Sequence, residues 1–243
     1  IVAHIARTIF VSSEEASIYF KKKFGQRKKI VLTGIPLRED VRGGDPARAY
    51  THFLFKSNLP TLLVIGGAQG ARALNDAVTT SREELEKFCQ IIHVSGEAHF
   101  EKLRVKSDDS QRYHLYPYLH QDLKDAYAIA QIVLTRGSAH VLNEIAYYGI
   151  PSIVVPIEKY ASPHQVANAK RLVAHQAGVL MHESQLDAGE LVGMLKKMLS
   201  DKQQFGAMGE HAKTLFIPDA ATHIGDELLA IGSIKKDTHD NRK

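Results

Sequence analysis

Short apolar runs alternate with longer amphipathic stretches along most of the chain, and this alternation restricts the fold more than any other feature of the sequence. The apolar run TLLVI at 61–65 is typical of a strand buried on both faces, and an amphipathic stretch at 71–88 follows it. Strands that alternate with helices through short connections form parallel sheets covered by helices. The sequence therefore predicts an α/β fold, a parallel sheet with helices on both faces.

The same periodicity gives the expected elements in chain order. We expect strands at 8–12, 29–33, 61–65, 90–94, 132–135, 152–155 and 179–181. We expect helices at 14–23, 71–88, 123–130, 139–148, 164–175, 188–199, 202–215 and 220–231.

The chain divides into three parts on this pattern. We interpret residues 1–45 as the end of a preceding domain and a linker, because 34–45 carries glycines and prolines. The regular domain is expected at 46–232, and the polar residues 233–243 are expected to form a disordered tail. Because the chain starts with Ile1 and a strand follows almost at once, we expect that an N-terminal portion is missing. The alternative is a complete chain whose initiator methionine has been removed.

The composition excludes several classes of protein. Hydrophobic residues make up 44% of the 243 residues and charged residues 24%, which is ordinary for a globular protein. No apolar run approaches the ~20 residues that span a bilayer. The net charge of +4 suits phosphate ligands or an anionic membrane surface and is too small to indicate nucleic acid. Cys89 is the single cysteine, so no intramolecular disulfide can form, which fits a reducing compartment.

The motif GGAQGAR at 66–72 follows the strand at 61–65 and opens a helix. Glycines let an anion approach the backbone closely, and the first turn of a helix carries unpaired N–H groups with partial positive charge. The motif therefore predicts a diphosphate or similar anion at this turn. The alternative is a turn that serves only close packing of strand and helix. The spacing matches neither the G-x-G-x-x-G of dinucleotide-binding folds nor a Walker loop.

A second motif, RGSAHVLNE at 136–144, also lies between a strand and a helix. Ser138 is well placed to cap the helix. Glu144 lies about two turns into it, and a carboxylate there can accept two hydrogen bonds from the vicinal hydroxyls of a ribose. The alternative is that Glu144 is solvated or forms a surface ion pair.

A third loop, EKYASPHQVAN at 158–168, follows the strand at 152–155. His164, Gln165 and Asn168 could donate hydrogen bonds to sugar hydroxyls, although His164 could equally have no ligand. The carboxyl ends of parallel strands meet at one edge of a sheet, so the three loops would converge there. That edge could hold one extended ligand with a base, a ribose, phosphates and a sugar.

Taken in order, these motifs resemble those of the MurG family, bacterial glycosyltransferases that add N-acetylglucosamine to the lipid-linked muramoyl-peptide precursor of peptidoglycan. GGAQGAR is similar to the family's GGSQGAR turn, and RGSAHVLNEIAYYGIPSIVVP to its R-S/A-G-A…E-I-A…G-L/I-P…V-P segment. HQVANA is similar to its sugar loop and GIPLRED to its G-N-P-V-R segment. The resemblance covers about 9–230 and corresponds to the family's C-terminal half. It implies a Rossmann-like, UDP-sugar-binding domain, the C-terminal domain of a GT-B glycosyltransferase.

The resemblance also implies which residues hold the donor. Arg38 would help to hold the UDP portion, and Glu144 the ribose hydroxyls. The backbone at Leu119 or His120 would meet the uracil. Residues 66–70 would form the turn, Ser138 and Ala139 with nearby amides would bind phosphate, and His164 and Gln165 would contact the N-acetylglucosamine. The full implied set of substrate-binding residues is Arg38, Gly66, Gly67, Ala68, Gln69, Gly70, Leu119, His120, Ser138, Ala139, His140, Glu144, His164 and Gln165.

Three positions depart from the family pattern: Ala68 replaces a serine, Ile35 replaces an asparagine, and Gly137-Ser138 inverts the usual order. The catalytic residues are unassigned, because the family carries its proposed base in the N-terminal half. No metal and no cofactor are implied. The implied partners are UDP-N-acetylglucosamine and a polyprenyl-linked acceptor bound by that missing half, with peripheral association at the cytoplasmic face of the bacterial plasma membrane. The alternatives are a related UDP-sugar transferase with another lipid acceptor or a split-subunit partner, and a non-catalytic nucleotide-binding module.

Overall fold

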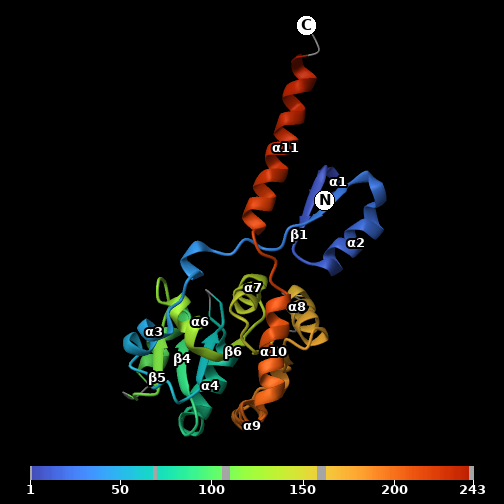
Figure 1. Cartoon of the computed structure of the whole chain (residues 1–243). Helices are drawn as coiled ribbons and strands as arrows, with labels where there is room; N and C mark the ends of the chain where they lie inside the picture. Colours follow the sequence, from blue (N-terminus) through green and yellow to red (C-terminus); the bar gives the residue numbers. More distant parts are fainter. Residues whose placement is uncertain (1, 68–69, 106–109, 158–162, 241–243) are drawn as a thin grey trace. The chain divides into compact units, whose positions relative to one another are not determined.

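The computed structural model describes residues 2–67, 70–105, 110–157 and 163–240, and these form two compact units. Residues 38–215 make the larger unit, and residues 1–37 group with 216–243 in the smaller one (Figure 1). The larger unit begins within the segment that we interpreted as a linker. The domain bounds that we placed at 45/46 and 232/233 stay a prediction.

A six-stranded sheet forms the centre of the larger unit, in the order β5-β4-β3-β6-β7-β8. Every neighbouring pair is parallel. The strands are β3 (Thr61–Ile65), β4 (Gln90–Val94), β5 (Tyr113–Tyr116), β6 (Ala130–Thr135), β7 (Ser152–Val154) and β8 (Gly178–Leu180). The parallel α/β fold expected from the sequence is confirmed.

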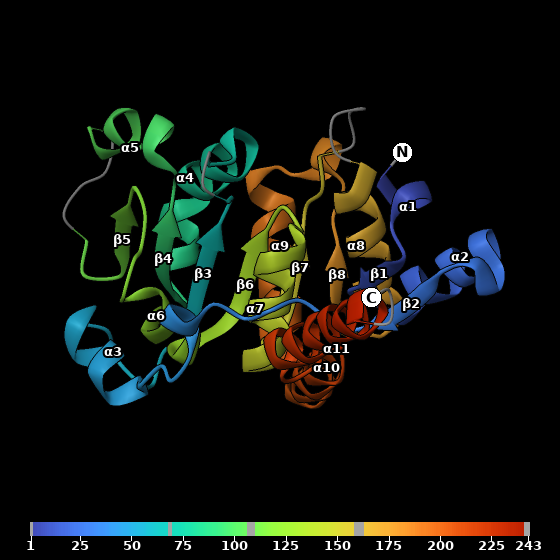
Figure 2. The same cartoon turned by 90° about the horizontal axis from the view of Figure 1, so that it is seen from above.

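Helices cover both faces of this sheet, as Figure 2 shows. On one face, Leu62 and Val64 of β3 pack with Leu74 of α4 and Leu195 of α9. Helices α6 and α7 lie on the other face (Figure 2). The helices of this unit are α3 (Pro46–His52), α4 (Arg72–Glu86), α5 (Glu97–Arg104), α6 (Leu123–Ile129), α7 (Ala139–Tyr148), α8 (Pro163–Ala174), α9 (Ala188–Ser200) and α10 (Lys202–Thr214).

Sequence patterns did not predict three of these elements: α3, α5 and the edge strand β5. β5 is only four residues long, and its sequence YHLY has neither alternating polarity nor a continuous aliphatic run. It is nevertheless in register with β4 from Tyr113 opposite Ile91 to Tyr116 opposite Val94. With β5 paired to β4 at the edge, strands β3 and β6 lie at the middle of the sheet. The glycine-rich turn follows β3 and the 136–144 loop follows β6, so the two are neighbours.

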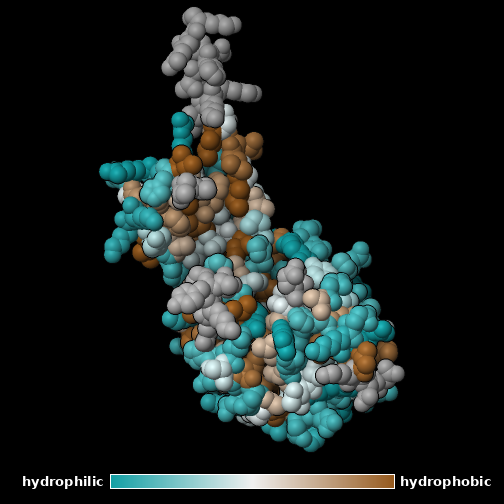
Figure 3. Space-filling view, turned by 180° about the vertical axis from the view of Figure 1, so that it is seen from behind, coloured by the Kyte–Doolittle hydropathy of each residue, from teal (hydrophilic) through white to brown (hydrophobic). Residues whose placement is uncertain are grey.

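The smaller unit contains a two-stranded parallel sheet, β1 (Thr8–Val11) and β2 (Lys29–Leu32), joined by α2 (Glu14–Phe24). The short α1 (Val2–Ile5) precedes β1, and α11 (Ala220–Asp240) completes the unit. Apolar side chains gather on the surface of this unit (Figure 3), where Ile18, Leu228 and Leu229 are exposed. Most of the buried apolar side chains in the described residues belong to the larger unit.

Helix α11 continues to Asp240 and so includes residues 233–240 of the segment that we expected to be a disordered tail. After Gly232 the described sequence SIKKDTHD contains no glycine or proline that would end a helix.

Candidate functional site

One pocket of about 280 Å³ in the larger unit lies at the carboxyl ends of β3 and β4, beside α6 and α7. We call it the α6–α7 pocket. Ile65 and Val94, the last residues of β3 and β4, form part of its floor. The other lining residues are Arg38, Gly67, Tyr118, Leu119, Leu123, Tyr127, Ser138, His140, Val141 and Glu144.

The glycine-rich turn needs its glycines for two different reasons. Gly67 and Gly70 adopt positive φ angles of 91° and 73°, which favour glycine. At Gly66 a Cβ atom would lie 2.6 Å from the amide nitrogen and Cβ of Ala71, and at Gly70 it would overlap the Ser95 carbonyl oxygen. A Cβ at Gly67 would meet nothing within 4 Å. The turn therefore packs tightly at both ends and has room at Gly67, the member that lines the pocket.

Helix α4 begins directly after this turn. Ala71 at its N-cap supplies no capping side chain, and its first turn contains no acidic residue. Its first N–H groups therefore keep their partial positive charge toward the turn, an arrangement that suits an anion. The expected contacts at Ala68 and Gln69 lie outside the described residues.

A buried hydrogen-bond chain supports the far side of the turn. Asn75 of α4 donates through Nδ2 to the Ser95 carbonyl at 3.0 Å, the oxygen against which Gly70 packs. Asn75 Oδ1 lies 2.9 Å from His93 Nε2, and His93 Nδ1 lies 2.8 Å from the Tyr113 hydroxyl. Because the amide oxygen can only accept, His93 donates through Nε2 and accepts from Tyr113. This neutral tautomer ties β4 and β5 to α4.

Burial lowers the pKa of His93 to about 3, so we expect acid to destabilise the protein through this residue. An unfolded histidine titrates near ~6.5, so between that pH and about 3 the unfolded state binds one more proton and stability falls as the pH falls. At pH 5 the loss relative to pH 7 is about 2 kcal/mol. Urea unfolding of the wild type and His93→Gln at both pH values checks this. Equal losses in the two proteins would contradict it.

The loop after β6 is fixed from both sides. Gly137 has a φ of 83°, and a Cβ there would lie 2.6 Å from Val154 Cγ1. Asn168 of α8 donates to the Gly137 carbonyl at 3.0 Å. Ser138 caps α7 as expected, because its side chain accepts from the Val141 N–H at 3.4 Å. Helix geometry leaves the amides of Ala139 and His140 without acceptors inside the helix.

Glu144 is a buried acid in this pocket, with 5% of its surface exposed. Tyr127 of α6 donates to Glu144 Oε2 at 2.8 Å. Burial raises the pKa of Glu144, and the Tyr127 hydroxyl and the Arg38 charge oppose this shift only in part. A buried carboxylate with one hydroxyl partner can accept further hydrogen bonds from a ligand. The solvated helix position that we left open as an alternative does not fit this burial.

Arg38 brings a cation to the same pocket. Its guanidinium forms two hydrogen bonds with Asp40, from Nε to Oδ1 at 2.9 Å and from Nη2 to Oδ2 at 2.8 Å. Asp40 is the main cause of the raised pKa of Arg38, and Tyr118 adds to it. The side chain remains 40% exposed, so it is accessible to a ligand.

The pocket brings together six of the residues implied by the resemblance: Arg38, Gly67, Leu119, Ser138, His140 and Glu144. Gly66, Gly70 and Ala139 flank it in the chain without lining it. His120 is exposed and also does not line it. Their roles as ligands stay a prediction.

The structure describes only part of the third loop, residues 163–168 of 158–168. His164 is exposed near the start of α8, and Gln165 Oε1 accepts from the Ile157 N–H at 3.0 Å. Neither residue lines the α6–α7 pocket. Residues 158–162 lie outside the described residues, so the proposed sugar contacts of this loop also stay a prediction.

Sequence reasoning missed the aromatic wall formed by Tyr118 and Tyr127. Tyr118 lies in the loop after β5, a strand that the sequence pattern did not predict, and Tyr127 resembles an ordinary core residue of a helix in the sequence. Its pairing with Glu144, 17 positions away, is a tertiary contact.

No helix among the residues that the structure covers is both long and apolar enough to cross a membrane.

Comparison with known proteins places these features in a family. The sequence pattern of the glycosyltransferase family 28 C-terminal domain matches residues 61–224. The chain is 30% identical over 226 residues to a UDP-N-acetylglucosamine--N-acetylmuramyl-(pentapeptide) pyrophosphoryl-undecaprenol N-acetylglucosamine transferase from Chlorobium phaeobacteroides, covering 93% of this chain and 60% of the relative. It is 30% identical over 220 residues to the protein of that name from Bacillus subtilis, covering 89% and 59%.

A crystal structure of Acinetobacter baumannii MurG has the same fold, with a TM-score of 0.70 at 23% identity, covering 94% of this chain and 62% of that one. The chain thus spans about 60% of the length of the relatives it matches. Since the family pattern extends over most of the chain and includes the glycine-rich turn, the 136–144 loop and the strands between them, the chain belongs to glycosyltransferase family 28 through its C-terminal domain.

Proposed function

We propose that this domain binds UDP-N-acetylglucosamine in the α6–α7 pocket and serves as the donor half of a transfer to a lipid-linked muramoyl-peptide. The observation that carries the proposal is the buried Glu144 carboxylate, which lies in one pocket with Arg38 and the glycine-rich turn. The pocket provides an acceptor for ribose hydroxyls, and a cation and helix amides for a diphosphate. The names of the relatives support the sugar and the acceptor.

The proposed orientation follows from the lining of the pocket. The uracil would lie against the apolar wall near Leu119, the ribose against Glu144, and the diphosphate between the start of α7 and the turn at Gly67. During transfer, negative charge develops on the departing UDP. Arg38 and the open helix amides would stabilise that charge, which is the chemical contribution we assign to this domain.

The other half of the reaction needs a base beside the acceptor hydroxyl. We propose that a second domain, corresponding to the remaining length of the relatives, holds the acceptor and this base. Because the acceptor named for the relatives is a polyprenyl lipid, we further propose that the protein works in the cytoplasm at the inner face of the membrane.

Titration calorimetry with a panel of nucleotide sugars tests the proposed donor. We expect binding of UDP-N-acetylglucosamine and UDP, weaker binding of other UDP-sugars, and none of ADP-glucose or GDP-mannose. Absence of UDP binding, or a preference for a purine nucleotide, would overturn the proposal. If UDP-N-acetylglucosamine binds and the protein completed by its acceptor domain transfers sugar only to a different lipid, the acceptor assignment alone is wrong.

Affinity for UDP-N-acetylglucosamine is expected to fall on acidification, beginning above the pH at which an ordinary glutamate titrates. The raised pKa of Glu144 means that it gains a proton early as the pH falls, and a protonated carboxyl cannot accept from both ribose hydroxyls. The doubly esterified diphosphate of the ligand does not titrate in this range. Calorimetry from pH 8 to 5 measures the effect. In Glu144→Gln this loss of affinity at acidic pH should disappear; an unchanged profile would exclude Glu144 as its source.

A further inference from the structure

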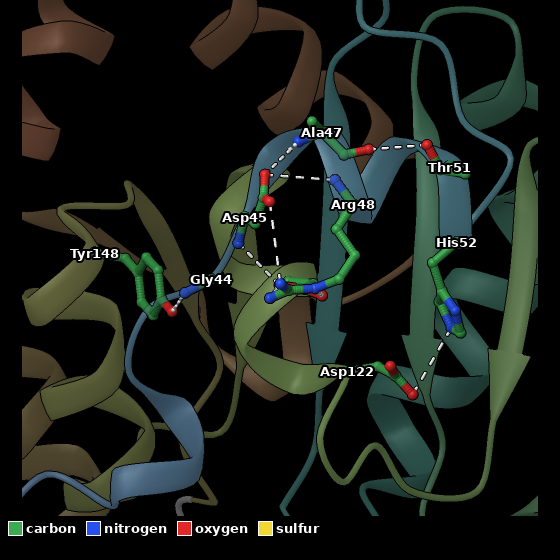
Figure 4. A network of polar contacts seen from close by, with 9 residues as sticks. Gly44, Asp45, Ala47, Arg48, Thr51, His52, Asp122 and Tyr148 are labelled. Carbon is green, nitrogen blue, oxygen red and sulfur yellow. Dashed lines mark hydrogen bonds and ion pairs between the residues drawn. The ribbon is translucent and has the colours of Figure 1, made fainter.

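Tyr148, at the end of α7, holds a backbone segment that leads to Arg38. Its hydroxyl donates to the Val41 carbonyl at 2.6 Å and accepts from the Gly44 N–H at 3.2 Å (Figure 4 shows the contact with Gly44). Burial raises the pKa of Tyr148 to about 12, so the hydroxyl remains protonated and can donate. One side chain thus fixes both ends of a four-residue stretch.

Asp125 of α6 provides a second attachment just beyond this stretch. Its carboxylate accepts from the Asp45 N–H at 2.9 Å and from Arg48 at 2.5 and 2.6 Å. Burial alone would raise the pKa of Asp125, but the Arg48 guanidinium and the Asp45 amide outweigh it, and the pKa lies below its usual range. Figure 4 shows Asp45 and Arg48 together with the neighbouring pair His52 and Asp122, whose Nε2 and Oδ2 atoms are 3.7 Å apart.

Gly44 allows the segment to lie directly on α6. A Cβ atom at this position would overlap the carbonyl oxygen of Lys124 and would lie 2.9 Å from Ala128 Cβ. Because any larger residue would push the segment away, the close approach is built into the sequence at this glycine.

The helices that hold this segment also form the wall of the α6–α7 pocket. The Tyr148 ring stacks on Tyr127, with centroids 5.3 Å apart and planes inclined by 19°. Tyr127 in turn donates to Glu144. The held segment leads back to Arg38 through the short helical turn Glu39–Val41, in which the Val41 N–H donates to the Arg38 carbonyl at 3.2 Å.

We propose that Tyr148 is a positioning residue for the donor: by fixing Val41 and Gly44, it sets Arg38 at a defined place relative to Glu144. The inference rests on the proposed function, since it assigns Arg38 to the diphosphate of the bound nucleotide. A guanidinium recognises a phosphate through directed hydrogen bonds, so its affinity depends on where its backbone is held. Tyr148 itself need not contact the ligand.

The test is Tyr148→Phe, which keeps the ring stack on Tyr127 and removes both hydrogen bonds. Because both neutral hydrogen bonds are lost, the Kd for UDP-N-acetylglucosamine should rise by about 5- to 150-fold. The Kd for uridine, which has no phosphate for Arg38, should stay unchanged. In an Arg38→Ala background, Tyr148→Phe should add little further loss.

Tyr19→Phe is the matched control, because Tyr19 belongs to the smaller unit and its side chain is exposed. Hydrogen exchange provides a readout that needs no ligand: the amides of residues 41–45 should exchange faster in Tyr148→Phe and unchanged in Tyr19→Phe. Unchanged exchange would overturn the inference. So would an equal loss of affinity for uridine and UDP-N-acetylglucosamine, or fully additive losses with Arg38→Ala.

These outcomes separate the inference from the proposed function. If the wild type binds no uridine nucleotide, both fail together. If the wild type binds UDP-N-acetylglucosamine and Tyr148→Phe binds it equally well, the inference about Tyr148 fails while the proposed donor site stands.

Discussion

Replacement of Glu144 with glutamine is expected to weaken the binding of UDP-N-acetylglucosamine by about 10- to 100-fold, the equivalent of one lost charged hydrogen-bond partner. The carboxylate can accept from both ribose hydroxyls, whereas the amide offers one acceptor oxygen and must turn an N–H toward the other hydroxyl. The amide oxygen can still accept from Tyr127, so the wall of the pocket should persist. Calorimetry gives the change in Kd, and circular dichroism confirms the retained fold.

Two comparisons make this result specific. Glu84→Gln removes the charge of a half-exposed helix glutamate that pairs with Lys87, and it should leave the affinity unchanged. The wild type should bind a 2′-deoxyribose analogue of UDP more weakly than UDP itself. Glu144→Gln should bind the two nucleotides with nearly the same affinity. If Glu144→Gln binds the nucleotide as tightly as the wild type, the ribose is not held by Glu144.

Replacement of Gly70 with alanine is expected to have a large effect on stability. The new Cβ would overlap the Ser95 carbonyl oxygen, and alanine would also have to adopt a φ of 73°. Strain of the backbone costs about 1–2 kcal/mol and overpacking about 1–3 kcal/mol. At about 2–4 °C per kcal/mol for a chain of this size, the midpoint of thermal unfolding should fall by roughly 4–20 °C.

Gly67→Ala separates the two causes, because Gly67 has a φ of 91° but open space around it. Gly67→Ala should cost only the backbone strain and lower the midpoint of thermal unfolding by roughly 2–8 °C. Differential scanning calorimetry of the two variants side by side measures the difference. Equal losses would mean that the contact between Gly70 and Ser95 does not hold the turn.

The sequence was most informative where local pattern and tertiary environment agree. Thr61–Ile65 is buried along its whole length and appears as an apolar run, so the central strand could be recognised. Ser138 could be predicted as a cap because capping depends on residues three positions apart. In contrast, β5 is recognisable only through its pairing with β4, and local sequence does not carry that information.

In the candidate site too, features set by the local backbone could be predicted and features set by tertiary contacts could not. The glycines of the turn are visible in the sequence because backbone conformation requires them. The contacts of Tyr127 with Glu144, and of Tyr148 with Val41 and Gly44, join positions 17 to 107 residues apart. Such contacts arise from the crossing of helices over the sheet, so neither spacing nor composition could reveal them.

A crystal structure of the protein with UDP-N-acetylglucosamine would show whether a single pocket holds the whole UDP portion of the donor, as we propose. We expect the ribose hydroxyls within hydrogen-bonding distance of Glu144, the uracil beside Leu119, and the diphosphate between Arg38 and the first amides of α7. Nucleotide bound elsewhere on the molecule, or bound here with its ribose turned away from Glu144, would rule out the proposed donor site.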